Sequence, residues 1–264
     1  MPLPLLTKEK ILLLASSNAG KTYQALWYIY HTIKAGKKAF VFDCDDGMAK
    51  IGREVSPFTE IADSPNLHFQ TVYSWEDMHD AADRMRKLTF QRGDLIVTEM
   101  VNYLWDWAQA QYSGDRFKQS VVEHHQDILE KGKNVQFGGF DGRADWPEIK
   151  RYYFDVLMAP FSTPANMLWT AGAKDLTPMD KESVKSMFEG IGVRNEGQRD
   201  VHYQVDTIVY LQYDRRSGER EWTTVKDRGG RSLLEDMTLS EGEDLWEMYY
   251  SAHDMTPPWL NGQK

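Results

Sequence analysis

The chain has 264 residues, of which 41% are hydrophobic and 12% aromatic, enough to bury one large α/β core. Its formal net charge of -9 excludes a protein that coats nucleic acid through a globally basic surface, although a local basic groove is compatible with it. The single cysteine, Cys44, excludes an intrachain disulfide framework and a cysteine-rich zinc cluster, which fits a reducing cytosol.

The sequence also lacks the pattern of a membrane or exported protein. No stretch approaches the roughly 20 consecutive apolar residues of a membrane span. The apolar start Met1–Leu6 is too short for a signal peptide. We therefore expect a soluble, cytoplasmic protein without membrane contact, and a single domain over residues 1–264.

An apolar strand over Ile11–Leu14 leads into the segment Ala15-Ser16-Ser17-Asn18-Ala19-Gly20-Lys21-Thr22, a phosphate-loop pattern. Backbone N–H groups of such a turn point at the β-phosphate, and the helix that follows adds the positive end of its dipole. Gly20 lets the backbone approach the phosphate, Lys21 places an ammonium between the β- and γ-phosphates, and Thr22 offers a hydroxyl to Mg²⁺. The predicted ligands of ATP are Ser17, Asn18, Ala19, Gly20, Lys21, Thr22 and Tyr23.

The next elements alternate between helices and strands. Apolar residues at helical spacing predict a helix over Thr22–Lys34. A short strand is expected over 67–73, a helix over Trp75–Leu88 and an apolar strand over Asp94–Thr98. This β-α-β-α order predicts a largely parallel sheet.

A buried strand over Lys38–Phe42 runs into an acidic turn. Because a parallel strand ends at the ligand edge of its sheet, one carboxylate of this turn is expected to orient or deprotonate the attacking water. Asp43, Asp45 and Asp46 are the candidates, and Asp45 is our first choice. The expectation assumes that this second strand lies beside the phosphate-loop strand.

Glu99 ends the strand that begins at Asp94, where the Walker B acid belongs. We predict that Glu99 and Thr22 hold Mg²⁺. Most proteins of this class have aspartate at this position, so the longer glutamate is a departure. Thr98 and Asp94 are alternatives that would share its role.

The middle of the chain is polar and glycine-containing. We interpret residues 113–145 as an insertion with a helix around Phe117–Lys131. A helix is expected over Trp146–Pro160 and a strand over Asn166–Ala171. Residues 172–200 are predicted to form a mobile loop.

Cations interleaved with aromatic side chains in such loops are the ingredients of a single-strand channel. The cations are Arg116, Lys118, Lys131, Lys133 and Arg143 in the insertion and Lys174, Lys181, Lys185, Arg194 and Arg199 in the loop, beside Phe117, Phe137 and Phe140. At the end of the preceding strand, Thr170 is a candidate sensor of the γ-phosphate.

Two strands, Gln204–Tyr213 and Glu221–Lys226, are predicted to close the sheet as an antiparallel hairpin. Lys226 and Arg228 follow at alternate positions of an extended segment, so they point to the same side. We predict that they enter a neighbouring subunit's active site and neutralise charge on the γ-phosphate. This requires a homo-oligomer, either a ring or a filament.

Taken in order, the phosphate loop, the acidic turn, the strands ending in Glu99 and Thr170, and the hairpin with Lys226-Asp227-Arg228 resemble the RecA-like ATPase core. The compact size, the insertion and the passage over 192–210 are most similar to small phage-encoded RecA-like ATPases of recombination and single-strand annealing. The resemblance implies a mostly parallel sheet flanked by helices, ATP hydrolysis, and single-stranded DNA on the loops after the two strands. A phage protein of this kind would act in the host cytoplasm.

Two other functions are compatible with the same motifs. A viral DNA-packaging or helicase-type motor shares the phosphate loop, although packaging ATPases usually carry Asp-Glu after the Walker B strand. A nucleotide-gated oligomeric scaffold would instead use ATP to lock an assembly and hydrolyse little of it. DNA-stimulated turnover separates a DNA-acting ATPase from the scaffold.

Overall fold

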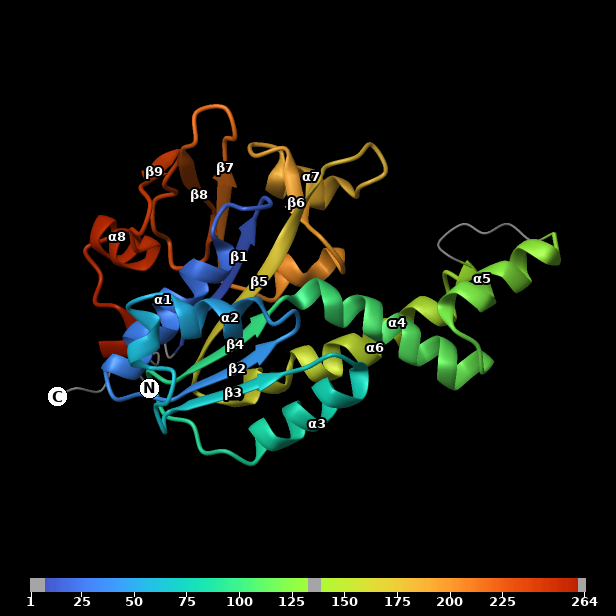
Figure 1. Cartoon of the computed structure of the whole chain (residues 1–264). Coiled ribbons are helices and arrows are strands. Elements are labelled where there is room, and N and C mark those ends of the chain that lie inside the picture. Colours follow the sequence, from blue (N-terminus) through green and yellow to red (C-terminus); the bar gives the residue numbers. More distant parts are fainter. Residues whose placement is uncertain (1–7, 133–138, 261–264) are drawn as a thin grey trace, which may run out of the picture.

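The computed structural model describes residues 8–132 and 139–260 (Figure 1). Its strands are β1 (Lys10–Ala15), β2 (Ala39–Asp43), β3 (Leu67–Thr71), β4 (Leu95–Glu99), β5 (Asn166–Asp175), β6 (Val193–Asn195), β7 (Thr207–Tyr213), β8 (Arg220–Asp227) and β9 (Met237–Leu239). Its α-helices are α1 (Lys21–Lys34), α2 (Gly47–Glu54), α3 (Trp75–Arg86), α4 (Val101–Phe117), α5 (Val121–Glu130), α6 (Asp145–Leu157), α7 (Glu182–Phe188) and α8 (Leu245–Ala252). None of the helices in these two ranges is both long enough and apolar enough to cross a membrane.

The strands form a mixed sheet in the order β3-β2-β4-β5-β1-β7-β8-β9, with β6 paired to the end of β5. The first six strands of this order are parallel, and β8 and β9 add antiparallel pairs. This arrangement confirms the predicted α/β fold class, a mostly parallel sheet flanked by helices with a C-terminal antiparallel hairpin. One expectation was wrong: β2 does not lie beside β1, because β5 and β4 stand between them.

Both faces of the parallel sheet are covered by helices (Figure 1), which is why the inner strands β2 and β4 are buried at every residue, whereas the outermost strand β3 is only partly buried. Side chains of β1 alternate between two cores. Ile11 and Leu13 pack on the side of α1 and α8, whereas Leu12 and Leu14 pack with residues of α3, α4 and α6. This alternation identifies the face of the sheet on which each strand-end side chain lies.

The insertion is more helical than expected. Helix α4 runs without a break to Phe117, and with α5 it projects from the body of the molecule (Figure 1). The Phe117 ring stacks on His124 with ring centroids 3.9 Å apart, and Phe140 is only 4% exposed. These aromatic residues therefore form a local core and not an exposed base-stacking surface, which corrects that part of the prediction. Lys133 and Phe137 lie outside the described residues.

Residues 172–200, predicted as a loop, contain the end of β5, helix α7 and strand β6. β6 pairs antiparallel with β5 from Ala173 to Asp175. A buried ion pair holds the turn between them, because Arg194 Nε donates to Asp180 Oδ1 at 2.9 Å. The sequence pattern missed this pair because β6 has only 3 residues and the residues that stabilise the connection are charged.

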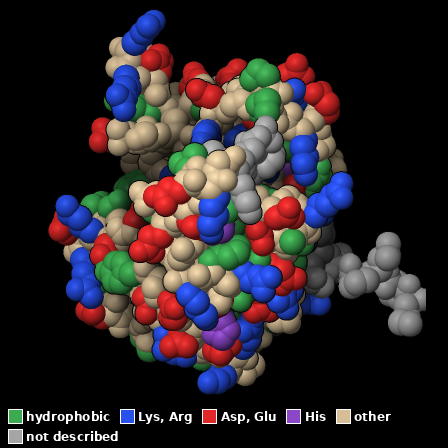
Figure 2. Space-filling view, turned by 90° about the vertical axis from the view of Figure 1, so that its right-hand side faces the viewer, with side chains coloured by type: hydrophobic (Ala, Val, Ile, Leu, Met, Phe, Trp, Pro, Cys, Tyr) green, Lys and Arg blue, Asp and Glu red, His purple; other side chains and the backbone are tan. Residues whose placement is uncertain are grey.

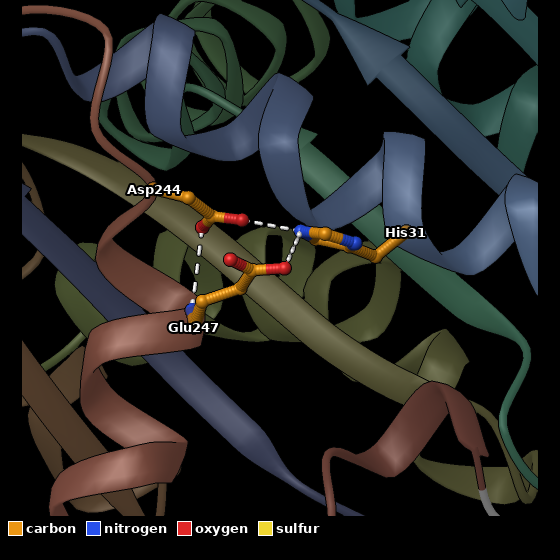
Figure 3. Close-up of side chains that lie close together, drawn as sticks. All are labelled: His31, Asp244 and Glu247. Carbon is orange, nitrogen blue, oxygen red and sulfur yellow. Dashed lines mark hydrogen bonds and ion pairs between the residues drawn. The ribbon is translucent and has the colours of Figure 1, made fainter.

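The C-terminal helix α8 is fastened to α1, the helix that follows the phosphate loop (Figure 3). His31 of α1 bonds to Asp244, and Glu247 Oε1 lies 3.8 Å from the His31 Nε2 atom. Asp244 also caps α8, since its Oδ1 accepts the Trp246 N–H at 2.8 Å. The buried Gln24 adds two further bonds to the chain segment that begins α8.

Candidate nucleotide site

The phosphate loop connects β1 to α1 and is tied to the neighbouring strand β7. The Ser16 N–H donates to the Leu211 carbonyl at 3.0 Å, and the Ser16 hydroxyl accepts the Tyr213 N–H at 3.2 Å. Gly20, the last residue before α1, has φ 94°, in the left-handed region that favours glycine. The loop therefore has the backbone geometry that its sequence predicts.

Glu99 lies at the centre of the site. It is the last residue of β4, its side chain is fully buried, and its Oε1 accepts hydrogen bonds from Lys21 Nζ at 2.5 Å and from Thr22 Oγ1 at 2.7 Å. Its second oxygen, Oε2, has no hydrogen-bond partner in the described parts of the chain. A buried carboxylate oxygen without a partner is costly, and together with a hydroxyl it forms an oxygen donor set that suits Mg²⁺.

The two alternatives to Glu99 lie elsewhere. Thr98 belongs to the opposite face of the sheet, because neighbouring residues of a strand alternate. Asp94 precedes β4 at the other edge of the sheet, where its two oxygens accept the N–H groups of Lys38 and Gln91. Glu99 is thus the acid of β4 that faces the phosphate loop.

Asp43 lies directly beside Glu99, because β2 and β4 pair in register at these two residues. It is fully buried; its Oδ2 accepts the Ala49 N–H at 3.0 Å, and its Oδ1 has no partner in the ranges that the structure describes. The pKa of Asp43 is raised to about 6, mainly by burial. The nearby carboxylates of Asp45 and Glu99 also raise it, whereas the backbone N–H groups of Ala49 and Asp45 lower it.

The other two acids of the turn are exposed. Asp45 is exposed, and its Oδ1 accepts the Gly47 N–H at 3.0 Å. Asp46 accepts a hydrogen bond from the Tyr73 hydroxyl at 2.6 Å, away from the sheet. The turn is close to Glu99 through the backbone, since the Cys44 N–H donates to the Glu99 carbonyl at 2.5 Å.

Thr170 joins the same edge from β5, the strand between β4 and β1. It pairs in register with Leu13 of β1 and is fully buried. Its hydroxyl has no partner within the described residues, so it is available to a group bound at this edge. Of the remaining predicted residues, Ser17 and Asn18 are exposed, whereas the Tyr23 ring packs against Phe58 at 5.0 Å.

Lys226 and Arg228 lie at the end of the strands opposite the phosphate loop, because β8 runs antiparallel to β7. Lys226 Nζ donates to the His202 and Val205 carbonyls, both at 2.6 Å. Burial and, to a smaller extent, the charge of Arg228 lower the pKa of Lys226 to about 8. The Arg228 side chain is 52% exposed and donates to the Tyr203 carbonyl at 3.0 Å.

The same antiparallel pairing places the first residue of β8, Arg220, at the phosphate-loop edge. No sequence motif singles out Arg220. The predicted hairpin could have indicated it. If the first strand of a hairpin ends near the phosphate loop, its second strand begins there.

A groove of about 650 Å³ lies beside the site, between the start of α4, the start of α6 and the β5–β6 hairpin. The residues that line it are Asn102, Trp105, Asp106, Gly142, Trp146, Lys150, Lys174, Lys181, Arg194, Glu196, Gly197, Gln198, Arg199 and Asp200. Most of its cations pair with Asp180 or Asp200, whereas Lys174 has no ion-pair partner in the described ranges. Elsewhere on the face seen in Figure 2, acidic and basic side chains are intermixed.

The raised pKa of Asp43 predicts that replacing this residue by asparagine stabilises the protein by an amount that depends on pH. The folded state holds the proton more tightly than the unfolded chain, so Asp43 lowers stability increasingly as the pH rises from about 4 to about 6. Asp43→Asn should raise the free energy of unfolding by about 1–3 kcal/mol at pH 8 and give little gain at pH 4. Urea denaturation at both pH values measures this, and an equal gain at both would contradict the assignment.

Comparison with known proteins identifies one matching family. A family model described as an AAA domain matches residues 7–233, which include the phosphate loop, Glu99 and the hairpin. Among solved structures, the crystal structure of the RadB recombinase is similar with a TM-score of 0.49 and 13% identity, over 86% of this chain and 84% of that one. No curated protein matches. The chain belongs to the AAA domain family and is a P-loop NTPase.

Proposed function

We propose that this protein binds and hydrolyses ATP and uses the reaction to act on single-stranded DNA, as a phage-type recombination or annealing ATPase. The observation that carries the proposal is the contact of Lys21 and Thr22 with one oxygen of the buried Glu99. An ammonium, a hydroxyl and a carboxylate are thereby assembled where the loop would hold the phosphates.

In this proposal, Lys21 binds the β- and γ-phosphates, and Thr22 with Glu99 holds Mg²⁺. Bound Mg²⁺ would withdraw negative charge from the phosphate oxygens. Asp45 orients and deprotonates the attacking water, because among the acids of its turn it is the one that is exposed and has no side-chain partner in the described structure. Thr170 senses the γ-phosphate through its buried hydroxyl.

We place single-stranded DNA in the groove beside the site. Lys174 supplies an uncompensated cation, and the stacked indoles of Trp105 and Trp146, with centroids 5.6 Å apart, supply aromatic surface for bases. Strand β5 carries both Thr170 and Lys174, so one rigid element connects the nucleotide edge to the groove. When Thr170 senses the loss of the γ-phosphate, this strand would transmit the change to the groove.

We further propose a homo-oligomer, a ring or filament, whose active site is completed between subunits. Lys226 is occupied by carbonyls of its own chain, whereas the half-exposed Arg228 is accessible to a neighbour. The trans contribution is therefore assigned to Arg228, with Lys226 fixing the strand that presents it.

ATP hydrolysis with and without single-stranded DNA tests the central claim. Wild type should be stimulated by the DNA. Lys21→Ala should lose ATP binding, whereas Asp45→Asn should bind ATP and lose about 10²- to 10⁴-fold in kcat, as expected on removing a general base. ATP binding with no stimulation by DNA would favour the nucleotide-gated scaffold.

Replacing Lys174 tests the groove. Lys174→Ala should weaken binding of a fluorescent single-stranded oligonucleotide and reduce the slope of log K against log salt by about one. The matched control is Lys185→Ala, since Lys185 pairs with Glu182 on α7 outside the groove. Equal losses in both variants would indicate general electrostatics, and tighter binding of RNA would reassign the nucleic acid.

Mixing two inactive variants tests the shared active site. Arg228→Ala keeps its phosphate loop, whereas Lys21→Ala keeps its Arg228, so a mixed oligomer contains some complete interfaces. Part of the DNA-stimulated rate should return on mixing. If each variant is inactive alone and no rate returns in oligomers shown to exchange subunits, Arg228 does not act in trans.

A further inference from the structure

Arg220 reaches the phosphate loop of its own chain. It begins β8 and pairs with Tyr213, the last residue of β7. Its guanidinium carbon lies 5.1 Å from the centroid of the Tyr213 ring, a cation–π contact that holds the side chain. A Cβ built on Gly20 would lie only 3.9 Å from Arg220 Nε, so the guanidinium stands next to the loop backbone.

The guanidinium of Arg220 has no hydrogen-bond or ion-pair partner in residues 8–132 and 139–260. Other half-buried and buried arginines differ: Arg194 pairs with Asp180, and Arg231 bonds to Glu9 and Asp227. A guanidinium offers five N–H donors in a planar fork that matches phosphate oxygens. Arg220 therefore has the chemistry and the position of a phosphate ligand.

The sheet order decides which phosphates it faces. β1 lies between β5 and β7. Glu99, on the β5 side, marks where metal and γ-phosphate belong, whereas Arg220 approaches the loop from the β7 side. Arg220 and Glu99 therefore lie on opposite sides of β1.

We propose that Arg220 binds the α- and β-phosphates of a nucleoside di- or triphosphate from within the same subunit, with Tyr213 orienting it. The proposal rests on the nucleotide-binding function proposed above. Because Tyr213 also donates its N–H to the Ser16 hydroxyl, the loop, the tyrosine and the arginine form one unit that is assembled in a single chain. This role differs from that of a finger contributed by a neighbour.

Affinities of wild type, Arg220→Ala and Arg220→Lys for MgADP and MgATP, measured by calorimetry, test the proposal. Arg220→Ala should weaken both nucleotides by the same factor, about tenfold to a hundredfold, because the contact does not involve the γ-phosphate. Arg220→Lys should recover part of the loss, since it keeps the charge without the fork. Arg216→Ala, in the exposed turn of the same hairpin, should bind like wild type.

Four results would overturn the assignment. They are unchanged affinities, a loss confined to MgATP, a loss for ADP that is absent for diphosphates of other bases, and an equal loss in Arg216→Ala. Thermal unfolding without nucleotide, unchanged in the variants, confirms that they fold. A wild type that binds neither nucleotide would instead contradict the proposed function and is therefore distinguishable.

Discussion

The site depends on one buried carboxylate. Glu99 is removed from water at the end of β4, and a charge in such a place requires a partner of opposite sign and good hydrogen-bond geometry. Lys21 and Thr22 supply both from the first turn of α1. The ion pair thus joins two elements 78 positions apart in the sequence, and it fixes the distance between the phosphate loop and the acidic edge of the sheet.

Asp43 and Thr170 extend this constraint to the neighbouring strands. All three side chains lie on the face of the sheet that α1 covers, and each has a buried oxygen without a partner in the described chain. A protein selected for stability alone would pair these atoms or replace them with apolar groups. The unpaired oxygens fit a site that accepts a polar ligand, and the burial that leaves them without water also raises the pKa of Asp43.

The sequence predicted the individual helices and strands better than it predicted which strands lie side by side. The start of α1 and the end of β4 were predictable, because a phosphate loop and an apolar run have short-range patterns that define them. Strand order is set by contacts between distant segments, so the position of β2 beyond β5 and β4 could not be deduced from its own residues. The same limit explains why the environments of Phe117 and Lys226 were not predicted. The exposure of Phe117 depends on its packing against His124, and the partners of Lys226 are backbone carbonyls of another segment.

The attachment of α8 to α1 restricts how the molecule can respond to a ligand. Gln24 and His31 lie about two turns apart on α1. His31 bonds to Asp244 (Figure 3), and Gln24 accepts the N–H of the next residue, Leu245. A helix that is held at its first turn by Glu99 and along its length by α8 cannot slide or rotate freely against the sheet. A nucleotide bound at the phosphate loop would therefore meet a helix whose position is already set, and α1 would serve as the fixed reference for the elements around it.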